Sequence, residues 1–126
     1  GLQEFQLWMD NNGPSSDRFG ISIYDGAWRS AYGSTFLSTN TWYHVAFTYN
    51  STVGKLYVNG VQEGSNLNYD LVDSDLNDIW IGETTSGLKD MDGLIDELVI
   101  YNRDLNVTEI NQIYSNNNLG ISLCSN

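Results

Sequence analysis

The chain has 126 residues, and five Lys and Arg stand against sixteen Asp and Glu, which gives a formal net charge of −11. This charge argues against binding to nucleic acid or to an anionic membrane surface, because both are recognised through Lys and Arg. Aromatic residues make up 13% of the sequence, which excludes a disordered acidic tail and indicates a folded domain with one hydrophobic core.

Short alternating runs, separated by Gly, Asn, Asp and Ser, fill most of the chain and predict an all-β sandwich. In the first run Phe5, Leu7 and Met9 share one face. A turn-rich stretch follows, and then a second strand is expected over 19–24 and a third over 27–32. The N-terminal third of the chain therefore predicts three consecutive strands.

The strongest expected strand covers 42–49, because it is rich in aromatic and β-branched residues. Both of its faces carry apolar groups, which predicts a central position in a sheet and places Trp42 in the core. A further strand over 55–58 meets Asn59-Gly60, a pair that favours a type I′ hairpin turn, and 61–63 should return antiparallel.

Two more strands are expected over 79–82 and 94–101. After them the spacing of the apolar residues changes from that of a strand to that of a helix. Apolar residues at helical spacing predict one short helix over about 107–115. Asn106 is a good N-cap, and Glu109 stands three residues later, as in a capping box.

Four of these pieces, in this order, resemble the laminin-G-like jelly-roll domains of the concanavalin A-like lectin/glucanase superfamily: residues 41–49, 56–60, 79–82 and 93–103, followed by the helix. The resemblance implies a two-sheet antiparallel jelly-roll sandwich with one helix near 107–115, forming a single domain over 1–126. The family's N-terminal strands have no counterpart here, so we expect an open sheet edge. Such an edge favours a homodimer or pairing with another chain.

A calcium site is one hypothesis for the 94–101 strand, because its two carboxylates interrupt faces that are otherwise apolar. At least one of Asp96 and Glu97 should then lie close to buried surface, where a carboxylate needs hydrogen bonds or a cation. Calcium takes oxygen ligands of this kind. The resemblance implies calcium ligation by Asp96, with Asp90 and Asp92 placed to help. Capping of Asp96 by backbone N–H groups is the alternative.

Aromatic residues are the expected ligand contacts, since sugar rings pack their C–H faces on Trp and Tyr. Trp8, Trp28 and Trp80 are the candidates, with Asp10 and Asn12 at the rim to pair with hydroxyl groups. The alternative for each tryptophan is a place in the core of the sandwich.

Catalysis is not expected. A glucanase that retains configuration needs two carboxylates about 5–5.5 Å apart, whereas Asp96 and Glu97 are adjacent in the expected strand and point to opposite faces. His44 and Cys124 are the only histidine and cysteine, so neither a zinc site nor an internal disulfide can form. We therefore expect a non-catalytic, extracellular or cell-surface module that binds carbohydrate. The alternatives are a protein-interaction or assembly module of a larger surface protein and, third, a glucanase remnant.

Overall fold

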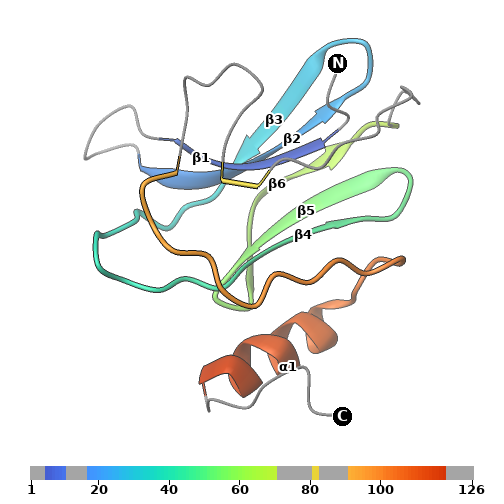
Figure 1. Cartoon of the computed structure of the whole chain (residues 1–126). Helices are drawn as coiled ribbons and strands as arrows, with labels where there is room; N and C mark the ends of the chain where they lie inside the picture. Colours follow the sequence, from blue (N-terminus) through green and yellow to red (C-terminus); the bar gives the residue numbers. More distant parts are fainter. Residues whose placement is uncertain (1–4, 11–16, 71–80, 83–90, 119–126) are drawn as a thin grey trace.

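The computed structural model describes residues 5–10, 17–70, 81–82 and 91–118 (Figure 1). They form two antiparallel three-stranded sheets and one helix, which confirms the expected two-sheet sandwich with a C-terminal-side helix. The first sheet has the order β1-β2-β3 and the second β4-β5-β6. The elements are β1 Phe5–Asp10, β2 Arg18–Tyr24, β3 Trp28–Tyr32, β4 Val45–Tyr49, β5 Val53–Val58, β6 Val61–Asn68 and α1 Val107–Asn118.

The register of the first sheet places odd-numbered and even-numbered side chains on opposite faces. Phe5 stands opposite Ile23 and Leu7 opposite Ile21, so the odd-numbered residues of these strands share one face. That face is turned toward the second sheet, because Ile21 and Ile23 are fully buried in the core. The even-numbered residues, Trp8 among them, lie on the opposite face, which we call the outer face.

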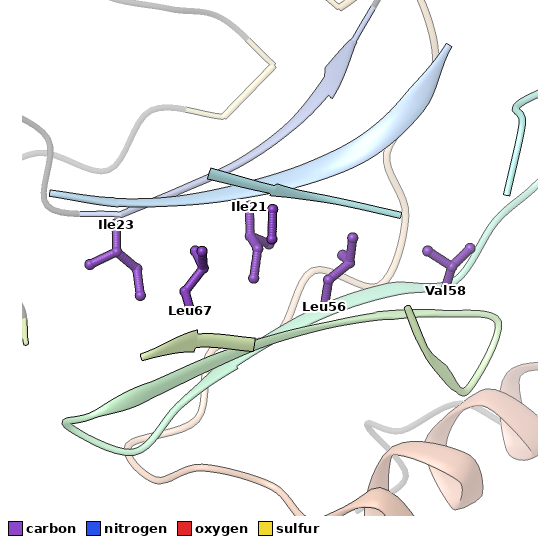
Figure 2. Packing of buried hydrophobic residues seen from close by; sticks show 6 residues of the cluster. Ile21, Ile23, Leu56, Val58 and Leu67 are labelled. Carbon is purple, nitrogen blue, oxygen red and sulfur yellow. The ribbon is translucent and has the colours of Figure 1, made fainter. Parts of the chain in front are cut away.

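The core lies between the two sheets (Figure 2). Ile21 and Ile23 reach down from the first sheet, and Leu56, Val58 and Leu67 reach up from the second. These side chains are at most 4% exposed, so the apolar surface that they remove from water is the main stabilising term of the sandwich.

The second sheet is built on the predicted hairpin. Asn59 and Gly60 have φ angles of 50° and 80°, both in the left-handed region that a type I′ turn requires. The returning strand β6 runs on to Asn68, beyond the three residues expected, and its register against β5 shifts between Gly54 and Leu56. The irregularity coincides with Gly64, whose φ is 71°.

Helix α1 forms a third layer beneath the second sheet, on the side away from the first (Figure 1). Ile110 is 2% exposed and packs with Tyr57 of β5 and with Leu105, while Ile113 and Ala46 lie at the margin of this cluster. The helix was expected to end near 115 and ends three residues later. Within the described ranges, no helix has the length and apolar character needed to cross a membrane.

The central position expected for the 42–49 strand was wrong, because β4 lies at the edge of the described sheet β4-β5-β6. The expectation for Trp42 was also wrong: Trp42 is 65% exposed and precedes β4, which begins at Val45. The reason lies in the neighbouring strand. Val45 pairs with Val58, and the hairpin turn begins directly after Val58. Residues before Val45 therefore have no part of β5 opposite them.

The prediction of a strand over 94–101 was also wrong. The segment lies outside both sheets, and Glu97 has a φ of 52°, which interrupts an extended run. Its apolar side chains are exposed, from 42% at Val99 to 77% at Leu94. Of the strand expected over 79–82, Ile81 and Gly82 are not in a strand, and residues 79–80 lie outside the described ranges.

Candidate functional site

The outer face of the first sheet carries two aromatic pairs with hydroxyl groups between them. Antiparallel register places its side chains in rows across the strands: Trp8, Gly20 and Tyr32 in one row, Gln6, Ser22 and Ser30 in the next, and Tyr24 with Trp28 in the third. Rows one and three are four residues apart along β2, about 13 Å. Among the described residues the only helix lies on the other sheet, so no helix covers this face.

Trp8 is held in place by three neighbours. Its indole lies on Gly20, since a Cβ atom at Gly20 would stand 2.6 Å from Trp8 Cζ2. The indole N–H donates a hydrogen bond of 2.9 Å to Ser22 Oγ. The ring of Tyr32 meets the indole edge to face, with centroids 5.1 Å apart. The absence of a side chain at Gly20 is therefore what lets the tryptophan lie flat on the sheet.

The middle and third rows add polar groups and a second aromatic surface. Ser22 and Ser30 share a hydrogen bond of 2.8 Å between their hydroxyls. Tyr24 and Trp28 pack edge to face at 5.4 Å, and Trp28 is 42% exposed. An exposed indole beside hydroxyl groups offers both an apolar surface and hydrogen-bonding partners to a molecule lying on the sheet.

Arg18 begins β2 opposite Asp10, one row beyond Trp8, Gly20 and Tyr32. Its guanidinium carbon lies 5.5 Å from the ring centroid of Tyr32 and 5.7 Å from that of Phe36, within range of cation–π attraction. Arg18 Nη1 donates a long hydrogen bond of 3.5 Å to the carbonyl of Gly33. The Nε–H is buried and has no hydrogen-bond partner among the described residues. The two aromatic rings thus hold a positive charge at one end of the outer face.

A carboxylate from the other sheet fixes the chain directly after β3. Glu63 accepts hydrogen bonds from the backbone N–H groups of Ser34 (2.8 Å) and Thr35 (2.9 Å) and from the Thr35 hydroxyl. Partial burial raises the pKa of the Glu63 carboxyl, but these hydrogen bonds outweigh it and hold the pKa below its usual value. At Gly64 the backbone approaches the carbonyl of Tyr32 so closely that a Cβ atom would stand 2.3 Å from it. Both contacts fix the Tyr32 end of the site.

The structure brings together two of the five predicted ligand contacts. Trp8 and Trp28 lie on the same outer face, in the first and third rows. Asp10 ends β1 opposite Arg18, while Asn12 and Trp80 lie outside the described residues.

The predicted metal ligands are only partly described. Asp92 and Asp96 are exposed, and Asp96 Oδ1 accepts a 2.9 Å hydrogen bond from the N–H of Glu97. The expectation that Asp96 or Glu97 lies close to buried surface was wrong, because both are exposed. Asp90 lies outside the described ranges. Within those ranges, no three His, Cys, Asp or Glu side chains gather where they could hold a metal ion. Calcium binding stays a prediction.

The sequence reasoning missed Tyr32, Ser22, Ser30 and Arg18 as members of the site. The signal that could have found them is the hairpin at Asp25-Gly26. Pairing Tyr24 with Trp28 across that turn places Ser22 opposite Ser30 and Gly20 opposite Tyr32. The parity of β2 then identifies every residue that shares a face with Trp28.

A second groove lies on the other side of the molecule, where the start of α1 meets β5 and β6. Lys55, Tyr57, Gln62 and Asn106 are among its lining residues. His44, the lone histidine, is half-buried near the ring of Tyr114, and burial lowers its pKa, so its imidazole is neutral at pH 7. Neither the groove nor His44 touches the aromatic rows of the outer face, which lie on the first sheet.

Comparison with known proteins supports the fold. A family model described as Laminin_G_3, concanavalin A-like lectin/glucanases superfamily, matches residues 1–111. No curated protein matches the chain. A crystal structure of an S-layer domain-containing protein (residues 221–444) from Clostridium thermocellum is similar, with a TM-score of 0.57 and 18% identity. The match covers 87% of this chain and 63% of that one.

Proposed function

The chain belongs to the concanavalin A-like lectin/glucanases superfamily, and from this premise we propose that it is a non-catalytic recognition module that binds carbohydrate on the outer face of β1-β2-β3. One observation carries the proposal: the Trp8–Tyr32 and Tyr24–Trp28 pairs flank the Ser22–Ser30 hydroxyl pair on one face of the sheet. Ser22 is only 4% exposed and supports the exposed Ser30 from beneath, while Trp28 and Tyr32 are exposed. The rings match the apolar C–H faces of sugars, and the Ser30 hydroxyl matches their polar rims.

The proposal of a non-catalytic role rests on the acidic residues. Hydrolysis of a glycosidic bond requires two carboxylates that face the same bond. None of the described side chains in the three rows of the outer face is a carboxylate. Asp96 and Glu97 are exposed and adjacent on a segment outside both sheets. The module is therefore proposed to hold a saccharide and to leave it intact.

A glycan array, followed by titration with intrinsic tryptophan fluorescence, tests the binding. Trp28→Ala removes an exposed ring of the site, and we expect it to lower affinity at least about tenfold, since stacking and burial of one aromatic ring contribute on the order of 1–3 kcal/mol. Trp42→Ala is the matched control, because Trp42 is 65% exposed and lies outside the site. Equal losses in both variants, or no binding to any glycan, would refute the outer face as the site.

A cell-surface location is part of the same proposal. The structural neighbour is described as an S-layer domain-containing protein, which supports this location for a module of similar fold. Calcium is the accompanying prediction: if Asp96, Asp92 and Asp90 ligate it, added calcium raises the melting temperature, EDTA reverses the rise, and Asp96→Asn abolishes it.

The second candidate function is an interaction or assembly module, and a specific observation favours it. Strands β1 and β4 are edge strands of the described sheets, and Phe5 at the start of β1 packs on Phe47 in the middle of β4, with ring centroids 5.9 Å apart. On the core side of β1, Phe5, Leu7 and Met9 remain 40–54% exposed. Exposed apolar residues beside two open edges favour the docking of another strand. Size-exclusion chromatography with light scattering tests it, and a monomer at all concentrations with no copurifying chain would count against it.

A further inference from the structure

We propose that the outer face binds an extended, unbranched and uncharged oligosaccharide of at least three sugar residues, which lies along β3 from Trp28 to Tyr32. This inference rests on the proposed function and names the ligand class for the same site. It follows from the outer-face residues of β3, Trp28, Ser30 and Tyr32, which we call the β3 track: their exposure, their spacing and their lack of charge.

The exposed side chains of the outer face come from β3. The three residues of the β3 track alternate along this strand, and all are exposed, with 42% at Trp28 and 43% at Tyr32. On β1 and β2 the described residues of the same face are buried or half-buried. A ligand that lies on this face therefore meets the β3 track first.

The length of the track requires more than one sugar. The Cα atoms of residues four apart in a strand are separated by about 13 Å, and this is the distance from Trp28 to Tyr32. A pyranose ring is about as wide as the six-membered ring of an indole, so one sugar contacts only one of the two aromatic side chains. A ligand that uses both needs a sugar on each of them and at least one more between, over Ser30.

Both aromatic ends of the track are supported before a ligand binds. Tyr24 packs edge to face on Trp28 at 5.4 Å, and Trp8 packs edge to face on Tyr32 at 5.1 Å. The guanidinium of Arg18 also contacts the ring of Tyr32, and this residue still keeps 43% of its surface exposed. Because the rings are already held by neighbours, less conformational entropy is lost when a sugar stacks on them.

The hydroxyl group between the rings supplies the polar contact. Ser30 Oγ lies 2.8 Å from Ser22 Oγ, which accepts the indole N–H of Trp8 at 2.9 Å. A hydroxyl group has one donor and two acceptor positions, so Ser30 keeps hydrogen-bonding capacity for a sugar hydroxyl after it pairs with Ser22. The middle sugar of a bound chain is therefore expected to hydrogen-bond to Ser30.

The charge and the shape of the track select the kind of chain. None of its three residues is charged, and the net charge of −11 repels an anionic polymer. The track follows one extended strand, so a matching chain must be extended as well. Chains with equatorial linkages, as in cellulose, form flat ribbons with C–H groups on both faces, whereas the axial linkages of amylose make a chain coil. We therefore expect the equatorially linked class to bind.

The experiment measures affinity against chain length by isothermal titration calorimetry, after the glycan array. Cello-, manno- and xylo-oligosaccharides of one to six units form the extended series, and malto-oligosaccharides form the coiled comparison. In the best extended series we expect affinity to rise at least about tenfold between two and four units and then to level off, the scale of one further aromatic contact made by a chain that is already bound.

Two variants test whether the chain lies on the track. Trp28→Ala and Tyr32→Ala should each lower affinity for the longest chain at least about tenfold and remove the gain between two and four units, because each variant leaves one aromatic end. Trp42→Ala is the matched control and should bind as the wild type does, since Trp42 is exposed and precedes β4 in the other half of the sandwich. Melting temperatures identify any loss of fold, and if Tyr32→Ala does not fold, Trp28→Ala decides.

The outcomes separate this proposal from the proposed function. A single sugar that binds as tightly as the longest chain would overturn the chain proposal and leave carbohydrate binding standing. A charged, coiled or branched saccharide as the best binder would do the same, and so would a length dependence that both variants leave unchanged. No binding by any saccharide would overturn both.

Discussion

Asn106 and Glu109 exchange hydrogen bonds across the first turn of α1. The N–H of Glu109 donates to Asn106 Oδ1 at 3.0 Å, and the N–H of Asn106 donates to Glu109 Oε2 at 2.9 Å. The same carboxylate accepts two hydrogen bonds from the guanidinium of Arg103, at 3.0 and 2.6 Å. This reciprocal cap fixes where the helix begins, and with it the position of Ile110 against the second sheet.

Removal of the cap should destabilise the domain. Asn106→Ala leaves the N–H of Glu109 without its side-chain acceptor, and we expect a loss of about 1 kcal/mol in the free energy of unfolding. Urea denaturation followed by circular dichroism measures it. Gln112→Ala, at an exposed position within the same helix, is the control and should change stability by much less. Equal stability of the wild type and Asn106→Ala would show that the cap contributes nothing.

The Glu109 carboxylate also makes the stability of the domain depend on pH. Hydrogen bonds from Arg103, and then from the backbone of Asn106, lower the pKa of Glu109 from 4.5 to about 2. The unfolded chain therefore binds a proton before the folded chain does, so this contribution is present above pH 4.5 and is lost as the pH falls toward 2. We expect the melting temperature of Glu109→Gln to depend less on pH than that of the wild type within this window. Parallel curves for the two proteins would contradict the assignment.

Glu63→Gln should loosen the link between the sheets. Both backbone N–H groups donate to Oε2, so the variant keeps its amide oxygen there and turns its NH2 group toward the Thr35 hydroxyl, and the hydrogen bonds to a charged acceptor are lost. We expect a loss of about 1 kcal/mol of stability. Since the hydrogen bonds lower the pKa of Glu63, their contribution is also lost as the pH falls through its folded-state pKa. Chemical denaturation at pH 7 and at pH 3 measures both effects, and a larger difference between variant and wild type at pH 3 would contradict them.

Local signals explain what could be predicted of the fold. The hairpin at Asn59-Gly60, the cap at Asn106 and the alternation of the first three strands each depend on residues close in sequence, and the structure confirms them. The predictions for Trp42 and for a strand over 94–101 were wrong for the same reason. An apolar, β-branched run indicates strand propensity, but a strand also needs a neighbour to pair with, and neighbours depend on distant parts of the chain.

The site was only partly predictable. Trp8 and Trp28 could be chosen from composition alone, because exposed aromatic residues are natural sugar contacts. Arg18 could not, since its place in the site comes from its contacts with the rings of Tyr32 and Phe36. Those are relationships between residues, and a linear pattern does not contain them.

Two glycines with positive φ test how closely β3 and β6 approach each other. Gly64 has a φ of 71° and lies so near Tyr32 that an added Cβ atom would stand 2.3 Å from its carbonyl oxygen. Gly26 has a φ of 105° and open space around it. We expect Gly26→Ala to cost about 1 kcal/mol from backbone strain alone, and Gly64→Ala to cost several kcal/mol or to prevent folding. Thermal denaturation compares them, and a Gly64→Ala variant as stable as Gly26→Ala would show that β3 and β6 are further apart.

Gly20→Ala should disrupt the site with little damage to the sandwich. The new methyl group would stand 2.6 Å from Trp8 Cζ2, so the indole has to leave its position and lose the hydrogen bond to Ser22. The core on the other face of β2 is untouched, because Ile21 and Ile23 point away from the substitution. We expect a shift in tryptophan fluorescence and a loss of affinity for the strongest saccharide on the array, while the melting temperature falls by only a few degrees. Gly93→Ala, whose nearest side chain is Met91, is the control. Full affinity in Gly20→Ala would show that the position of Trp8 on the sheet is not needed for binding.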